Sequence, residues 1–166
     1  MKTGTFLVTS VDDEAATLRD VHDGQVITLT SGAIPADAVV ESDVAASRLE
    51  AGEVLKATVA PEPPLEVAYQ LHAVDSRRTI PVTEHSEPPT TMAREIASEQ
   101  AEGEVTREER AGEGEIHVLT VPPERTEQAV ADVVDDEETV ARAARMGVDR
   151  VSIRAAEGVV SVRYLP

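Results

Sequence analysis

The stretch from Thr83 to Thr91 divides the sequence into two parts with different hydrophobic patterns. Pro88 and Pro89 lie within it, and neither a helical nor a strand period runs through it, which is typical of a linker. Short β-type runs separated by turns precede this stretch, whereas helix-type runs alternate with strands after it. The sequence therefore predicts an α+β protein of two domains, 1–85 and 86–166.

The first part contains five short runs of β-type residues. They span Thr3 to Thr9, Ala15 to Asp20, Gln25 to Thr30, Glu53 to Val59 and Glu66 to Val74. Asp23-Gly24 is a strong hairpin signal between the second and third runs, because glycine tolerates the positive φ that such a turn needs. Pro61, Pro63 and Pro64 separate the last two runs. Five short strands predict a small antiparallel β-barrel of the OB or SH3 type.

A long connection from Ser31 to Gly52 separates the third strand from the fourth. It is rich in Ala, Ser and Asp, and its alanines weakly favour a helix over Asp37 to Leu49. A mobile excursion is the alternative. Barrels of this size often carry a helix or a long loop at this point, so both alternatives fit the predicted domain.

A helix is expected directly after the linker. Thr90 or Thr91 is placed to cap its first turn. The helix would run to about Ala101, with Met92 and Ile96 on one face.

A second short helix is expected a few residues later. Thr106 and Glu109 have the spacing of a capping box, in which each side chain accepts a hydrogen bond from a backbone amide of the first turn. Gly112 and Gly114 would end this helix, because glycine is the preferred residue after a helix.

The rest of the second part predicts a β-α-α-β-β layer. Paired prolines stop a strand and suit the start of a helix. A carboxylate at the start and a glycine after the end indicate a second helix. The elements expected are a strand over Glu115 to Val121, a helix from Pro122-Pro123 to Val134, a helix from Asp135 or Asp136 to Met146-Gly147, and strands over Asp149 to Ala155 and Val159 to Leu165.

The last two strands can be aligned with each other. A two-residue turn at Glu157-Gly158 pairs Ala156 with Val159, Ile153 with Val162 and Val151 with Tyr164. This register gathers the apolar side chains on the inward face. It leaves four side chains pointing outward, Ser152, Arg154, Ser161 and Arg163.

Acidic residues dominate the charge of the chain. Thirty-two Asp and Glu against fifteen Lys and Arg leave a net charge of −17, and only Lys2 and Lys56 are lysines. At molar salt the Debye length falls to about 3 Å, so the repulsion within such a chain is largely screened. The acids are spread along the whole sequence, which favours a protein of a salt-rich cytosol over an ordinary acidic protein.

Several classes of protein are disfavoured by the sequence. No run of apolar residues is long enough to span a bilayer, and the first ten residues lack the apolar core of a signal peptide, so a cytoplasmic protein is expected. The chain has no Cys, which excludes disulfides, thiolate nucleophiles and Cys-type zinc sites.

Two segments carry a resemblance to a known family. They are RTIPVTEHSEPPTTMAREIASEQAEGEVTREERAGEGEIHVLTVPPE, which begins at Arg78, and the ending GVDRVSIRAAEGVVSVRYLP. The chain resembles a family of small acidic proteins of unknown function from halophilic archaea over nearly its whole length. The resemblance implies a haloarchaeal cytoplasm. It supplies no activity, ligand or catalytic residue.

The sequence contains no recognisable catalytic, metal or cofactor motif. No HExxH, glycine-rich phosphate loop or GxSxG pattern occurs, so no cofactor, metal site or catalytic residue is predicted. Acidic runs such as Asp135 to Glu138 are expected from composition. Glu115 and His117 share one face of a strand and are the best candidates for an acid–base pair, although a half-buried histidine near a polar neighbour is the more ordinary interpretation.

Arginines stand out near the C-terminus. From Thr139 to Pro166 there are five Arg against Asp149 and Glu157, a local balance of +3. Guanidinium groups suit bidentate contacts to carboxylates or phosphates, whereas pairing with nearby acids is the structural alternative. The candidate binding residues are Arg154, Arg163, Arg150 and Arg145, with Arg77 and Arg78 beside the last strand of the first domain.

Three functions fit these observations. The leading hypothesis is a non-catalytic binding or adaptor protein with a protein partner. The alternatives are an RNA- or ribonucleoprotein-associated protein, and a small enzyme centred on Glu115 and His117. Few aromatic residues are available to stack on bases, and nothing indicates DNA or a membrane as a partner.

Overall fold

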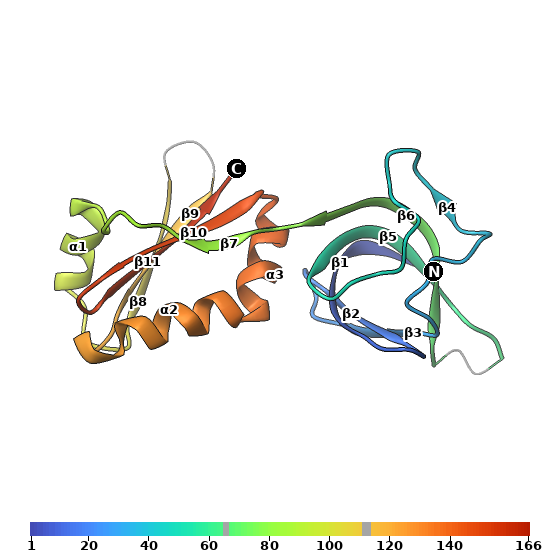
Figure 1. Ribbon diagram of the computed structural model, residues 1–166, viewed down its shortest axis with the longest axis horizontal. Helices are drawn as coiled ribbons and strands as arrows, with labels where there is room; N and C mark the ends of the chain where they lie inside the picture. Colours follow the sequence, from blue (N-terminus) through green and yellow to red (C-terminus); the bar gives the residue numbers. More distant parts are fainter. Residues whose placement is uncertain (65–66, 111–113) are drawn as a thin grey trace. The chain divides into compact units, whose positions relative to one another are not determined.

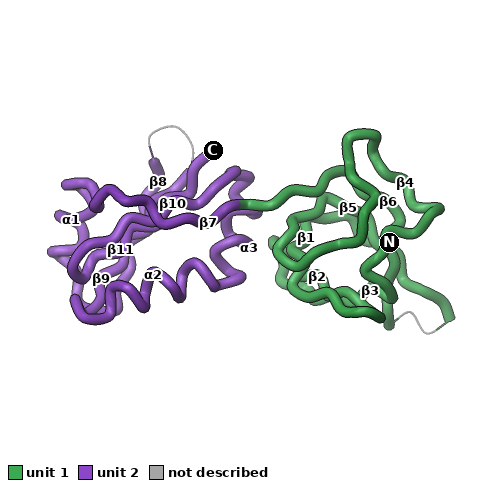
Figure 2. The backbone as a smooth tube through the Cα atoms, in the orientation of Figure 1, with its two compact units in different colours: residues 1–80 green, residues 81–166 purple. Residues whose placement is uncertain are grey.

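The computed structural model describes residues 1–64, 67–110 and 114–166. It divides after Ile80 into two compact units, residues 1–80 and 81–166 (Figure 2). The second unit begins just before a strand over residues 82–84, so residues 83 and 84 of the expected linker are part of its sheet. Together the units form a mixed α+β protein in which strands predominate.

The N-terminal unit is built on one sheet (Figure 1). Its strands are β1 (Lys2–Val11), β2 (Ala16–Asp20), β3 (Val26–Leu29), β4 (Val39–Val40), β5 (Glu53–Pro61) and β6 (Tyr69–Thr79). They are ordered β3-β2-β1-β5-β6-β4, and β3 also pairs with β6 in parallel through Leu29 and Tyr69. The pairings therefore run in a ring through the five longer strands, which correspond to the five expected. Glu66, the expected start of the last strand, lies outside the described residues.

The core of this unit is aliphatic around one fully buried aromatic ring, with Tyr69 packed against it. Phe6 is fully buried, and Leu18, Leu55 and Val74 pack in the same cluster. Alternation along the strands places these side chains on one side of the sheet. A chain with 2% aromatic residues builds its core from β-branched and leucine side chains.

The connection between β3 and β5 is not helical. Apart from β4, which pairs in parallel with β6, it runs through turns, so the helix expected over Asp37 to Leu49 is wrong. Leu49 is 2% exposed in the core, and its amide donates to the carbonyl of Gly32 at 2.8 Å. The Arg77 guanidinium binds the carbonyl oxygens of Ala45, Ser47 and Arg48. These tertiary contacts outweigh the weak helix propensity of the alanines.

The C-terminal unit combines a sheet with short helices. Its elements are β7 (Val82–Glu84), α1 (Thr91–Ser98), β8 (Val105–Glu109), β9 (Glu115–Thr120), the 3-10 helix η1 (Pro123–Arg125), α2 (Thr126–Asp135), α3 (Glu137–Met146), β10 (Arg150–Ala156) and β11 (Val159–Leu165). The strand order is β7-β10-β11-β9-β8, and only β7 is parallel to its neighbour. The predicted β-α-α-β-β sequence is the run from β9 to β11.

Local sequence signals account for the helices of this unit. The Thr90 hydroxyl accepts from the amide of Ala93, and the Asp136 carboxylate accepts from the amide of Glu138 at 2.9 Å. Gly147 ends α3 in the left-handed conformation with φ 76°, which glycine adopts without strain. Ala93 and Ala97 are the buried residues of α1, Ile96 packs against the same cluster, and Met92 is 50% exposed.

The second short helix expected at Thr106 is a strand. Val105–Glu109 forms β8, which pairs with β9 along its whole length. The Thr106 hydroxyl donates to the side chain of Gln100 instead of capping a helix. Pairing with the exposed edge of β9 satisfies more backbone groups than one helical turn would, which explains the difference. Gly112, expected to end that helix, lies outside the described residues.

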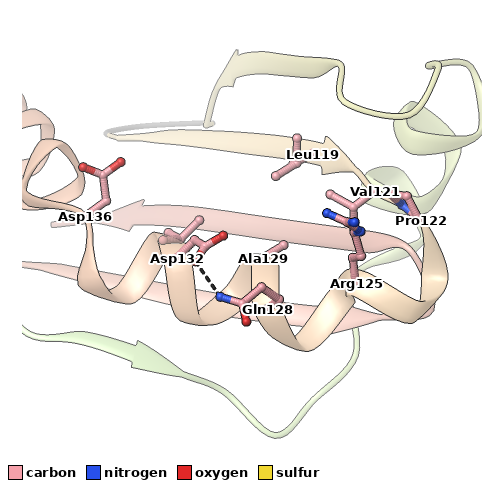
Figure 3. Close-up of a pocket in the computed structure, with 9 residues that line it drawn as sticks. Leu119, Val121, Pro122, Arg125, Gln128, Ala129, Asp132 and Asp136 are labelled. Carbon is pink, nitrogen blue, oxygen red and sulfur yellow. Dashed lines mark hydrogen bonds between the residues drawn. The ribbon is translucent and has the colours of Figure 1, made fainter.

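The two faces of the C-terminal sheet carry different helices. Ile116 and Val118 of β9 pack against α1. Leu119 points to the opposite face, where it lines a groove beside α2 (Figure 3). In the parts of the chain that the structure describes, no helix combines the length and apolar character that crossing a membrane requires.

Candidate binding surface on the C-terminal sheet

The register of the last hairpin places two arginines on one face. The predicted pairs Ala156 with Val159, Ile153 with Val162 and Val151 with Tyr164 are confirmed. Ser152 lies opposite Arg163 and Arg154 opposite Ser161, so the arginines are diagonal neighbours on the face that carries α1.

The two serines of this face are buried, contrary to their expected outward exposure. Ser152 is 7% exposed and Ser161 is 1% exposed. The helix α1 and the residues before it occupy this side of the sheet, which the hairpin alone does not reveal. The arginines therefore extend from a partly covered face, and their guanidinium groups are only partly accessible.

Arg154 makes one ion pair and keeps one unsatisfied donor. Its Nη2 lies 3.3 Å from the Glu87 carboxylate, and its side chain is 16% exposed. Its Nε is buried and has no hydrogen-bond partner among the described residues. Glu87 is 64% exposed on the segment before α1, so this pair lies at the edge of solvent.

Positive charge accumulates around Arg163. Burial lowers the pKa of its guanidinium, neighbouring arginines lower that pKa further, and Glu87 opposes the shift. These neighbours are Arg154, Arg110 and Arg150. Within residues 1–64, 67–110 and 114–166, no carboxylate lies within 4 Å of the side chains of Arg163, Arg150 or Arg110. We call Arg110, Arg150, Arg154 and Arg163 the arginine cluster.

One member of the cluster was missed by sequence reasoning. Arg110 follows β8, and its amide donates to the carbonyl of Gly114, the residue before β9. A helix in place of β8 would have put this residue elsewhere. The segment VTREE has no apolar alternation that would have indicated a strand beside β9, so the sequence offered no signal for this placement.

The other candidate arginines are engaged elsewhere. Arg145 pairs with Glu138 at 2.9 Å on α3. Arg77 and Arg78 lie on β6 of the N-terminal unit, where Arg78 is opposite Val54. The side chain of Arg77 is 7% exposed and makes a bidentate pair with Glu53 at 2.8 and 2.9 Å. Arg77 thus stabilises its own unit and presents little surface to a partner.

The proposed acid–base pair of β9 forms in the structure. His117 Nε2 lies 3.1 Å from Glu115 Oε1, and the imidazole centroid is 4.8 Å from that of Tyr164. Burial lowers the pKa of His117, and Arg142 lowers it as well, whereas Glu115 raises it. The lowered pKa favours the neutral imidazole at neutral pH, and the side chain is 9% exposed and therefore largely enclosed. The geometry suits proton exchange between the pair better than contact with a substrate.

A groove of about 300 Å³ lies on the other face of the sheet, between the end of β9 and α2 (Figure 3). Its apolar surface comes from Leu119, Val121, Pro122, Ala129 and Val133. Arg125 and Asp136 lie toward opposite ends of the groove, and Gln128 donates to the Asp132 carboxylate at 2.8 Å between them.

The described residues offer no grouped metal ligands. Among them, no three His, Asp or Glu side chains are arranged so that they could hold a metal ion. The acidic run at Asp135 to Glu138 serves α3 instead, because Asp136 caps that helix and Glu138 pairs with Arg145. The arginine cluster is therefore the strongest candidate site for an external partner.

Comparison with known proteins gives one family. A model of a family of unknown function, DUF5812, matches residues 2–155. The searches of curated proteins and of solved structures found no match. Because the family model covers most of both units, the chain belongs to the DUF5812 family, whose function is unknown.

Proposed function

We propose that this chain is a non-catalytic binding protein whose arginine cluster holds an acidic segment of a partner protein. The observation that carries the proposal is the gathering of four guanidinium groups in a chain of net charge −17, with only Glu87 as a paired carboxylate among the described residues. Like charges that repel each other stabilise nothing in the free protein. An anionic partner would relieve that repulsion.

The chemistry of the cluster suits carboxylates. Guanidinium groups form planar, bidentate, charge-assisted hydrogen bonds, and the unsatisfied Nε of Arg154 adds a donor beside the Glu87 pair. Glu87 is exposed and can exchange with an incoming carboxylate of the same kind. Ser152 and Ser161 are buried on the same face, opposite Arg163 and Arg154 respectively.

RNA is the second candidate partner, and the N-terminal unit supplies the observation in its favour. Without the short β4, its ring of pairings follows the order 1-2-3-5-4-1 with the third and fifth strands parallel. This is the order of an OB-type barrel, a fold that often binds oligonucleotides. We propose this fold for the unit. RNA is less favoured as the partner, because Tyr69 is the only aromatic residue of that unit besides the buried Phe6.

An enzyme centred on Glu115 and His117 is the third candidate. The two side chains are within hydrogen-bond distance, as such a mechanism requires. The imidazole is largely enclosed, and the groups near it include Tyr164 and Arg142 of the same unit. We therefore infer a packing role for this pair.

The setting of the protein is also proposed. The charge of −17, its spread along the chain and the choice of Arg over Lys support a cytoplasmic protein of a salt-adapted archaeon. We further propose that the two units, residues 1–80 and 81–166, fold as separate domains, since each has its own sheet.

The test is affinity purification from a lysate of the encoding organism in molar KCl, with proteins and RNA identified in one eluate. The wild type is compared with Arg150→Glu/Arg163→Glu. A matched control, Lys56→Glu/Arg94→Glu, makes the same charge change at exposed positions outside the cluster. We expect a protein that the wild type and the control retain and the cluster variant loses.

The other outcomes are equally informative. Enrichment of RNA that depends on the cluster would replace the acidic protein by the RNA alternative. Equal recovery of every partner by all three proteins would contradict a role for the cluster.

A further inference from the structure

The groove beside α2 has charges that are poorly placed for its own helix. Arg125 lies at the N-terminus of α2 and Asp132 lies near its C-terminus. A helix dipole favours negative charge at the N-terminus and positive charge at the C-terminus, so both side chains oppose the dipole of α2. Among the residues that the structure describes, no carboxylate lies within 4 Å of the Arg125 guanidinium.

The same charges are complementary to a second copy of the groove. Arg125 and Asp132 are seven residues apart on one side of α2, about 10 Å along the axis. A two-fold axis near Ala129 would bring Arg125 of each copy to Asp132 of the other. It would also set two α2 helices antiparallel, the orientation in which their dipoles attract.

The surface between these charges suits close helix packing. Ala129 has a small side chain at the midpoint, and Val133 and Leu119 are half-buried beside it. Val105, which lies opposite Leu119 on β8, is 45% exposed and extends the apolar surface to the edge of the sheet. Burying such surface is favourable in water and leaves only the rim charges to fix the orientation.

We propose that the chain forms a two-fold homodimer through this groove, with α2 packed antiparallel to α2 of the second copy. Each interface contains two equivalent contacts between Arg125 and Asp132 across an apolar centre. The surface is independent of the arginine cluster, which lies on the other face of the sheet. The dimer would present two clusters to a partner.

Charge exchange tests the two-fold arrangement specifically. Sedimentation equilibrium is measured at the lowest KCl concentration at which circular dichroism shows every variant to be folded. The wild type is expected at twice 17.7 kDa. Arg125→Glu and Asp132→Arg each place like charges at both contacts, so each alone should weaken dimerisation at least tenfold.

Recombining the exchanged charges should restore the dimer. An equimolar mixture of the Arg125→Glu and Asp132→Arg chains has opposite charges at both contacts and is expected to form a heterodimer. The chain with both substitutions should form a homodimer again. Glu127→Arg is the control, because Glu127 is an exposed residue of α2 that does not line the groove.

Three results would overturn the proposal. They are a monomeric wild type, dimerisation that the single substitutions leave unchanged, and single variants whose mixture stays monomeric. A groove that served a small ligand or a different protein would give the first of these results.

Discussion

Arg77 of the N-terminal unit and Arg163 of the C-terminal unit show two different uses of the same side chain. The Arg77 side chain is 7% exposed, pairs with Glu53 and binds carbonyl oxygens of the connection between β3 and β5. Arg163 has no carboxylate within 4 Å among the described residues and lies near other arginines. Arg77 uses its hydrogen-bond donors within its own unit, whereas Arg163 has no such carboxylate partner in the described part of the chain.

This contrast separates stability from binding. A guanidinium whose donors are all used internally holds its own fold together and has nothing left for a partner. A guanidinium among like charges contributes little to the fold and retains donors for an external anion. The predicted function therefore depends on the C-terminal unit, although the two units have similar shares of basic residues, six of 80 and nine of 86.

The largest expected effect is that of removing Arg77. Arg77→Ala would remove the guanidinium donors from the Glu53 carboxylate and from three carbonyl oxygens, so we expect the free energy of unfolding to fall by about 3–5 kcal/mol. Urea denaturation followed by circular dichroism measures this change. A loss below about 1 kcal/mol, the level of an exposed ion pair, would show that the contacts of Arg77 are not structural.

Salt should stabilise both units. Each carries about twice as many acidic as basic residues, so repulsion falls as KCl rises from dilute to molar concentration. We expect the melting temperature to increase by several degrees, which corresponds to more than about 1 kcal/mol for a chain of this size. A melting temperature that does not respond to KCl would contradict adaptation to salt.

Acid should destabilise the C-terminal unit through His117. Burial lowers the pKa of this histidine in the folded protein below its ordinary value of 6.5, so the unfolded chain binds the proton more strongly. The stability that His117 contributes is complete above pH 6.5 and is lost as the pH falls through the lowered pKa, by at most about 1.4 kcal/mol per pH unit.

Unfolding free energies at several pH values between 7 and 5 measure this contribution. His117→Asn should have a flatter dependence on pH than the wild type over this range. Parallel curves for the two proteins would show that His117 does not titrate as its burial implies.

The smallest expected effect is that of removing Arg163. Because its neighbours are positive, Arg163→Ala should change the unfolding free energy by no more than about 0.5 kcal/mol, or raise it slightly. The same urea experiment used for Arg77 provides the comparison. A loss as large as that of Arg77→Ala would mean that the cluster stabilises the fold.

Local signals in the sequence were sufficient for most of the fold. The hairpin register and the end of α3 at Gly147 depend on neighbouring residues and were predicted correctly. The caps Thr90 and Asp136 were each one of two neighbouring candidates. The strand β8 was predicted as a helix because the capping-box spacing is a local signal. The pairing of β8 with β9, which makes it a strand, is not visible in the local sequence.

The site was harder to predict than the fold. Five arginines near the C-terminus are visible in the sequence, but their partners depend on elements distant in the chain. Glu87 meets Arg154 from the segment before α1, and Arg77 meets the connection before β5. Spacing along the chain contains no information about such contacts, which is why Arg77 and Arg163 were placed in one set of candidates.

The most direct test of the central claim is an NMR titration that observes arginine Nε–H groups individually. A glutamate-rich peptide is added to the full chain in the presence of KCl, with an RNA oligonucleotide in a parallel sample. We predict that the peptide shifts the signals of Arg150, Arg154 and Arg163 and leaves that of Arg77 unchanged. Signals that do not move, or that move equally for Arg77 and the arginine cluster, would contradict the proposed binding surface.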